Sequence, residues 1–249
     1  YTPINLVRCL TVSESFKLWK NMRKALIGKS PNLSMERSCW DAGYEIVAGL
    51  DEVGKGAWAG PLTIVALVPN RNCRINGVRD SKMLKEAERE KLFDRIDKWS
   101  EDWSLGHASN EECDELGMSM AQRIAARRAI DGLIKRPDRL LLDGTWDFVS
   151  DGRSETIVRG DQISLSIAAA SIMAKVSRDR IMKEADKLYP DYDFPQNKGY
   201  PSPKHRLALE SKGATFFHRR TWGFMKNIPP IGAPYIKKIE AQTNIFELK

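Results

Sequence analysis

The stretch G-L-D-E-V-G-K-G-A-W-A-G-P occupies residues 49–61 and separates two apolar runs. EIVAGLD (45–51) precedes it and PLTIVALV (61–68) follows it, and both are rich in the aliphatic residues that predict buried strands. The first run ends in the acids Asp51 and Glu52. Because a lone buried carboxylate costs several kcal/mol unless it is paired, protonated or bound to a cation, these two acids are candidate functional residues.

Two further predicted strands end in the same way. DRLLLDG (138–144) ends at Asp143, and ETIVRGD (155–161) ends at Asp161. Acids delivered to the ends of several strands would repel one another, and a divalent cation would hold them together. Oxygen-only ligands favour Mg²⁺ or Mn²⁺. The alternative is that each acid caps a turn or a helix.

The remaining pattern alternates helices with strands. Helices are predicted over residues 81–99, 111–134 and 165–188, and Asn110 is the expected N-cap of the second helix. A third strand is predicted over residues 102–109. The apolar side of the second helix is expected to carry Leu116, Met120, Ile124, Ile130 and Ile134. Ala168, Ala169, Ala170 and Ser171 permit close contact between the third helix and a sheet. These elements predict an α/β fold, a mixed sheet flanked by helices.

Positive charge is concentrated in two segments of the 249-residue chain, which has 40 Lys and Arg against 33 Asp and Glu. Residues 198–226 hold seven basic residues and one acid, interleaved with aromatic residues, which favours a surface that binds nucleic acid. The alternative is a solvated basic face over packed aromatics. Residues 1–40 predict a basic helical leader, with a linker at 29–34. We therefore divide the chain into a leader (1–40), a catalytic domain (41–195) and a basic helical part (196–249).

Several classes of protein are disfavoured. The longest apolar runs are far shorter than the roughly 20 residues that span a bilayer, so no membrane location is expected. The four cysteines form no C-x-x-C pair, which argues against a zinc site and fits a reducing cytoplasm. Residues 49–56 resemble a phosphate-binding loop but have Gly56 where that motif needs Ser or Thr.

DEVGKGAWAGP (51–61) resembles the DEVGRGxxxGP signature of ribonuclease HII, the type 2 ribonuclease H family. The resemblance spans about residues 40–225 and continues through the blocks DSKML (80–84), LLLDG (140–144), RGDQISLSIAAASIMAKVSRDR (159–180), KGYPSPKH (198–205) and GATFFHRRTWG (213–223). It implies a ribonuclease H-like mixed sheet with a helical C-terminal extension.

By the same resemblance, ten residues are expected in the site. The metal-binding and catalytic acids would be Asp51, Glu52, Asp143 and Asp161; substrate would meet Gly54, Lys55, Gly56, Ser81, Lys82 and Tyr200. The glycine turn would read a 2′-hydroxyl, and Tyr200 would face the adjacent sugar. Asp80 and Asp179, which lie in matching blocks, are interpreted as structural.

The implied activity is an endoribonuclease that cuts 5′ to ribonucleotides in RNA–DNA hybrids and at single ribonucleotides in duplex DNA, as in ribonucleotide excision repair. Two Mg²⁺ or Mn²⁺ ions would assist in-line hydrolysis to a 3′-hydroxyl and a 5′-phosphate. The expected state is a cytoplasmic monomer. Lys55 is the form typical of ribonuclease HIII, whereas Val53 is the HII form. The alternatives are an HIII-like enzyme restricted to hybrids, or a non-catalytic binding protein on the same fold.

Overall fold

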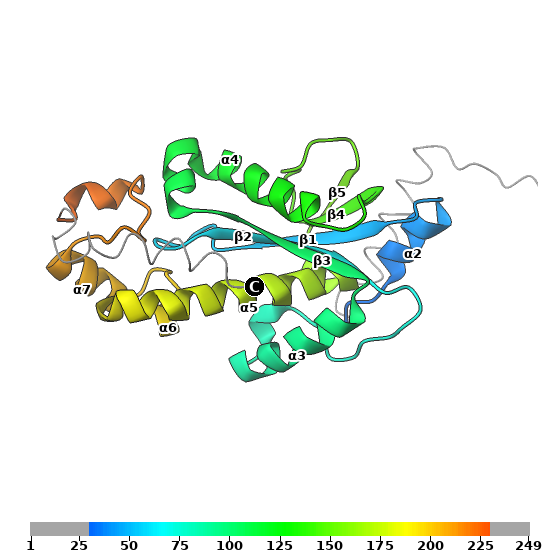
Figure 1. The fold of residues 1–249 in the computed structure, drawn as a ribbon, viewed down its shortest axis with the longest axis horizontal. Coiled ribbons are helices and arrows are strands. Elements are labelled where there is room, and N and C mark those ends of the chain that lie inside the picture. Colours follow the sequence, from blue (N-terminus) through cyan, green and yellow to red (C-terminus); the bar gives the residue numbers. More distant parts are fainter. Residues whose placement is uncertain (1–29, 230–249) are drawn as a thin grey trace, which may run out of the picture.

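A five-stranded mixed sheet forms the centre of the computed structural model, which describes residues 30–229 (Figure 1). Its strand order is β3-β2-β1-β4-β5, and the strands are β1 (Val47–Val53), β2 (Leu62–Val68), β3 (Asp102–Ala108), β4 (Arg139–Asp143) and β5 (Ser154–Ile157). β1 pairs antiparallel with β2 and parallel with β4. The predicted α/β mixed sheet is therefore confirmed.

Helices cover both faces of this sheet. Figure 1 shows α4 (Asn110–Asp131) on one face, and α3 (Glu86–Trp99) with α5 (Leu165–Leu188) on the other. Every residue of β2 is buried as a result, and its side chains alternate between the two apolar cores. The shorter helices are α2 (Ser34–Asp41), η1 (Ser81–Met83), η2 (Gly160–Gln162), η3 (Pro190–Tyr192), α6 (Phe194–Asn197), α7 (Pro203–Lys212) and η4 (Gly223–Asn227).

Glycines in the strands let the long helices approach closely. A Cβ atom added to Gly49 of β1 would lie 2.5 Å from the backbone nitrogen of Ile167 in α5. One added to Gly106 of β3 would lie 2.1 Å from the carbonyl oxygen of Ala125 in α4. The facing helix positions are correspondingly small, and Ala168–Ala170 are completely buried, as the sequence predicts.

The predicted cap and apolar side of α4 are wrong in part. Ser109 is the N-cap, with its side chain accepting from the Glu112 backbone N–H, whereas the Asn110 amide donates to the Phe216 carbonyl at 2.7 Å. Leu116, Met120 and Ile134 are exposed. Gly117 has φ 76° and ψ 159°, which interrupts the helix and shifts the buried face. That face consists mainly of the residues Cys113, Ala121, Gln122, Ala125, Ala126, Ala129 and Ile130.

Three other boundaries differ from the sequence-based expectation. The predicted helix 81–99 is the short turn η1 followed by α3. β5 ends at Ile157, so Asp161 is not at a strand end but in η2, where the chain turns into α5. α2 packs on the sheet through Met35 and Cys39, so the proposed boundary at residue 40 falls inside a helix that contacts the core. The predicted leader helix lies outside the described residues.

The C-terminal part packs around residues 57–60. Trp58 and Ala59 share an apolar cluster with Tyr192, Phe194 and Phe217. In the basic segment 198–226, the residues Lys198, His205, Phe217, His218 and Arg219 are buried, whereas Lys204, Arg206, Lys212, Arg220 and Lys226 are exposed. The segment therefore supplies part of the domain core as well as an exposed basic face.

Candidate active site

A cavity of about 430 Å³ opens where the carboxyl ends of β1 and β4 meet. It contains nine of the ten predicted site residues, because its lining comprises Asp51, Glu52, Val53, Gly54, Lys55, Gly56, Ser81, Lys82, Asp143, Ser171, Lys175 and Tyr200. Parallel pairing of β1 with β4 brings Asp51 and Asp143 to the same edge of the sheet. Asp161 is absent from the lining but is close enough for the charge of Asp143 to act on it.

The acids share an unfavourable electrostatic environment. Burial, together with the charges of Asp143 and Glu52, raises the pKa of Asp51 well above its usual range. Burial also raises the pKa of Glu52, and the Asp143 charge adds to this while Lys55 opposes it. Burial and Asp143 raise the pKa of Asp161 to about 6. These carboxylates are therefore held together at an electrostatic cost.

Hydrogen bonds orient two of the carboxylates. The Asp51 Oδ1 atom accepts from the Glu52 backbone N–H at 2.8 Å, and Ser171 also hydrogen-bonds this side chain. Asp143 Oδ1 accepts from the Gly160 backbone N–H at 2.6 Å, which ties β4 to the turn that carries Asp161. Between residues 30 and 229, no three Asp, Glu, His or Cys side chains converge tightly enough to hold a metal ion as they stand. The donor chemistry nevertheless suits a hard divalent cation, because all four groups are oxygen ligands that repel one another.

The two glycines of the Gly54–Gly56 turn have different environments. Gly54 has φ +91°, and a Cβ atom there would lie 2.3 Å from Arg178 Nε and 2.6 Å from the Pro61 carbonyl oxygen. Its backbone N–H donates to the Tyr200 hydroxyl at 3.0 Å. Gly56 has no positive φ, and a Cβ atom there would meet nothing within 4 Å. Folding therefore requires glycine at position 54, whereas the missing side chain at position 56 only leaves room in the cavity.

Two buried arginines donate hydrogen bonds to backbone carbonyls in and just after this turn. Arg178 of α5 donates to the Pro61 and Ala59 carbonyls, each at 2.9 Å, and its guanidinium lies 5.4 Å from the Tyr200 ring centroid. Arg219 donates to the Gly60 and Lys55 carbonyls at 3.0 and 3.1 Å. Interpreting Arg219 as part of an exposed phosphate-binding surface is wrong, since its relative exposure is 1%.

Sequence reasoning did not assign a site role to Ser171 or Lys175. Ser171 joins the Asp51 carboxylate to Ser81, whose hydroxyl lies 3.0 Å from its own. Both residues lie in the block 159–180 that matches the family, and the small size of Ser171 by itself indicates only close helix packing. Lys175 pairs with Asp179, and Asp80 accepts from the Lys82 backbone N–H at 2.9 Å, so both of these acids have structural partners as expected.

The strand order, the helices on both faces and the acids at the edge of the central strand define a ribonuclease H-like α/β protein. The family model for ribonuclease HII matches residues 48–225. A ribonuclease HII of Streptomyces avermitilis is 43% identical over 201 residues, covering 80% of this chain and 86% of the relative. One from Clostridioides difficile is 43% identical over 193 residues, covering 78% and 75%.

Solved structures of proteins from this family have a similar fold. The ribonuclease H2 of Pyrococcus horikoshii superposes with a TM-score of 0.62 at 25% identity, covering 82% of this chain and 100% of that one. The ribonuclease HII of Archaeoglobus fulgidus, solved in complex with PCNA, gives 0.61 at 25% identity, covering 72% and 95%. The chain belongs to the ribonuclease HII family and is a nuclease of the ribonuclease H type. In the described part of the chain, no helix has the length and apolar character needed to cross a membrane.

Proposed function

We propose that this nuclease hydrolyses the phosphodiester 5′ to ribonucleotides, both in RNA–DNA hybrids and at single ribonucleotides within duplex DNA. The observation that carries the proposal is the hydrogen bond from the Gly54 N–H to the Tyr200 hydroxyl at 3.0 Å. It joins an aromatic ring to the Gly54–Gly56 turn, directly beside the acidic edge of the sheet. A cavity with cleavage chemistry and sugar-reading groups side by side suits a nuclease that selects one ribose.

The four acids supply the cleavage chemistry. Asp51, Glu52, Asp143 and Asp161 would hold two Mg²⁺ or Mn²⁺ ions, which when bound supply Lewis-acid activation of water and stabilise the departing 3′-oxygen. The raised pKa values of Asp51 and Glu52 support this role, because repulsion between the acids favours a cation. The products would be a 3′-hydroxyl and a 5′-phosphate, with the 2′-hydroxyl serving only recognition.

The neighbouring residues would position the substrate. The open space at Gly56 allows a sugar to approach the backbone, and the partly exposed Tyr200 ring faces the same cavity. Partial burial alone would lower the pKa of Lys82, but the charges of Asp161 and other nearby acids raise it overall. Lys82 therefore remains a cation, which suits contact with a phosphate. The exposed basic residues of 196–229, such as Lys204 and Arg206, would bind the backbone further away.

One assay tests these proposals together. A duplex DNA with one ribonucleotide and a continuous RNA–DNA hybrid are each incubated with Mg²⁺, with Mn²⁺ and with EDTA. We expect both to be cut in either metal, with 3′-hydroxyl ends, and neither in EDTA. Cleavage of the hybrid alone would indicate an HIII-like enzyme, and cleavage of neither would indicate a binding protein. Full activity after exhaustive chelation would contradict the metal-dependent mechanism.

A further inference from the structure

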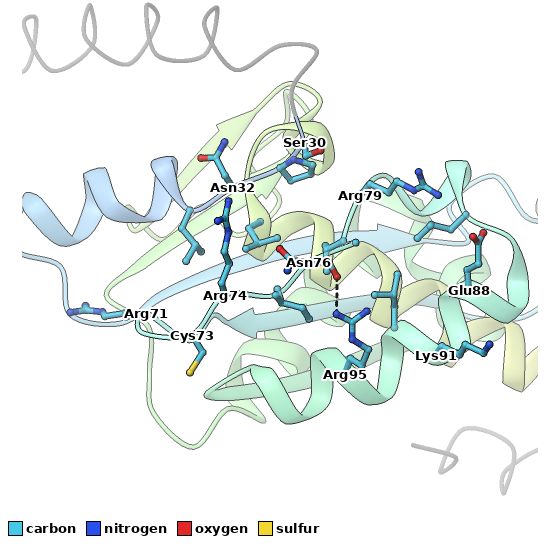
Figure 2. Close-up of a pocket in the computed structure, with 18 of the residues that line it drawn as sticks. Ser30, Asn32, Arg71, Cys73, Arg74, Asn76, Arg79, Glu88, Lys91 and Arg95 are labelled. Carbon is cyan, nitrogen blue, oxygen red and sulfur yellow. Dashed lines mark hydrogen bonds between the residues drawn. The ribbon is translucent and has the colours of Figure 1, made fainter.

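A second and larger cavity, of about 960 Å³, lies between the loop 69–79, α3 and residues 30–33 (Figure 2). Its lining is strongly basic: Arg37, Arg71, Arg74, Arg79, Lys91 and Arg95 contribute to it, and Glu88 is the only acid among the described residues that line it. We call this cavity the basic groove. None of the ten predicted site residues lines it.

The positive charge of the basic groove is not balanced by its surroundings. Among residues 30–229, none of the six cations takes part in an ion pair. The Glu88 carboxylate is occupied in capping α3, where it accepts from the Lys85 backbone N–H at 2.7 Å. Arg95 donates to the Asn76 carbonyl at 2.9 Å, as Figure 2 shows, and Arg71 lies over the Trp40 ring. Arg37, Arg74, Arg79 and Lys91 are exposed and have no carboxylate partner in the part described.

The basic groove adjoins the active-site cavity along two segments. Arg79 lines the groove, and Ser81 and Lys82, which follow almost directly, line the active-site cavity. On α5, Leu165 lines the groove and Ser171 lines the active-site cavity. Six residues of α-helix correspond to about 9 Å, so the two cavities are neighbours.

We propose that the basic groove binds phosphates of the nucleic-acid substrate beyond the cleaved bond, on the Lys82 side of the active site. This inference rests on the proposed function. A strand advances about 3.4 Å per nucleotide, so one arm of a duplex bound at the active-site cavity would reach the neighbouring groove within a few nucleotides. Residues 1–29 are not complementary to the groove, since they contain six Lys or Arg and one acid. A polyanion that already occupies the neighbouring cavity fits both the charge and the position.

The test measures binding without turnover. Affinity for a labelled hybrid duplex is determined in EDTA over a range of salt concentrations, for the wild type and for the double variant Arg74→Ala/Arg79→Ala. The control Arg127→Ala/Lys135→Ala removes two exposed cations, one on α4, which covers the opposite face of the sheet, and one four residues after the end of α4. We expect the groove variant to bind about tenfold more weakly and to flatten the log–log salt slope by about one to two units, with the control near wild type.

DNA duplexes that carry one ribonucleotide, and that are shortened on one side of it, provide the positional test. One truncation should weaken wild-type binding but have little further effect on the groove variant, while the opposite truncation affects both proteins alike. Arg74→Lys/Arg79→Lys should retain affinity, because the charge is kept. Equal losses in the groove and control variants, or equal sensitivity to both truncations, would overturn the assignment. A chain that binds through the groove yet cuts no duplex would refute only the proposed function.

Discussion

Gly56 allows the substrate role of the glycine turn to be separated from its structural role. Gly56→Ala should keep the melting temperature within about 1 °C of wild type, because the added methyl meets no atom within 4 Å. It should nevertheless lower kcat/KM by tenfold or more, because that methyl would occupy the space left for a ribose. Thermal melting and steady-state cleavage of a single-ribonucleotide duplex check this.

Two other glycines serve as controls for this prediction. Gly223 is also free of crowding and of positive φ, and it does not line the active-site cavity, so Gly223→Ala should change neither quantity. Gly54→Ala should destabilise the protein, since its Cβ atom would meet Arg178 and its φ is +91°. Unchanged cleavage by Gly56→Ala would remove the turn from substrate recognition.

Asp51 is expected to serve catalysis at the expense of stability. Burial and two neighbouring acids raise its pKa, so the charged form is unfavourable in the folded protein near neutral pH. Asp51→Asn should therefore abolish nearly all turnover and, in EDTA, raise the melting temperature by a few degrees. Hybrid binding in EDTA should be retained or strengthened, since a negative charge is removed. A variant that melts well below wild type would identify Asp51 as a structural residue.

At the scale of elements, the sequence predicts the segments well but their ends less well. Periodicity locates β1, β2 and α5 because buried strands and a 24-residue helix leave strong apolar patterns. It misplaces the apolar side of α4 because one glycine, Gly117, shifts the helix phase. It also places Asp161 at a strand end, because a short 3₁₀ turn leaves no periodic signal.

The candidate site also contains residues that the sequence predicts and contacts that it does not predict. The acids could be chosen from their positions beside apolar runs, and the family blocks added Gly54–Gly56 and Tyr200. The Gly54–Tyr200 hydrogen bond joins residues 146 positions apart, and local patterns contain no information about such a contact. The burial of Arg219 could not be predicted for a related reason. An arginine is usually expected at the surface, and the carbonyl groups that Arg219 contacts, those of Gly60 and Lys55, lie far away in the sequence.

Glu36 of α2 also makes contacts between residues far apart in the sequence, and these contacts link α2 to the start of α5. It is fully buried, and its Oε1 accepts from the Ser164 hydroxyl at 2.6 Å and from the Ser166 N–H at 2.8 Å. Ser164 is the N-cap of α5, three residues after Asp161. Glu36 therefore fixes the turn that carries a proposed metal ligand.

Replacing Glu36 should lower both stability and turnover. Glu36→Ala should cost about 1–3 kcal/mol of unfolding free energy, because buried donors lose their acceptor, and kcat should fall as Asp161 loses its fixed position. Glu36→Gln keeps an acceptor oxygen and should lose less of both, which fits a carboxyl whose pKa is already raised by burial. Ser109→Ala, which removes the α4 cap on the opposite face, should cost about 1 kcal/mol without changing kcat. Equal losses of kcat in the Ala variants of Glu36 and Ser109 would contradict a positioning role.

At the scale of the whole molecule, a chain of buried hydrogen bonds connects the C-terminal part to the active site. The Thr215 N–H donates to His218 Nδ1 at 3.0 Å, and the two histidine Nε2 atoms lie 2.9 Å apart. His205 Nδ1 lies 3.0 Å from the Tyr200 carbonyl oxygen, which can only accept. Each ring is therefore neutral, with His218 donating to His205 and His205 donating to Tyr200. A proton added to His205 would go to Nε2 and break the contact between the rings, whereas one added to His218 would go to Nδ1 and break its contact with the Thr215 N–H.

This arrangement predicts that the three histidines contribute a loss of stability in mild acid. Burial lowers the pKa of His107 to about 4 and lowers those of His205 and His218, so all three histidines of the chain resist protonation in the folded state. In the unfolded chain they would bind protons near pH 6.5. Their stabilisation is therefore complete above about pH 6.5 and is lost as the pH falls toward the folded values. For His107 alone the loss at pH 5 is on the order of 2 kcal/mol.

The active-site acids act in the opposite direction, so the histidine contribution needs a direct measurement. The pKa of Asp161, raised to about 6, lets the folded state take up protons and gain stability as the pH falls. Proton NMR of the imidazole resonances distinguishes the two effects, because it follows each histidine separately. We expect each histidine to titrate below pH 6.5 while the protein stays folded. A resonance that titrates near pH 6.5 would show an accessible ring and would contradict the neutral His205–His218 pair and its link to Tyr200.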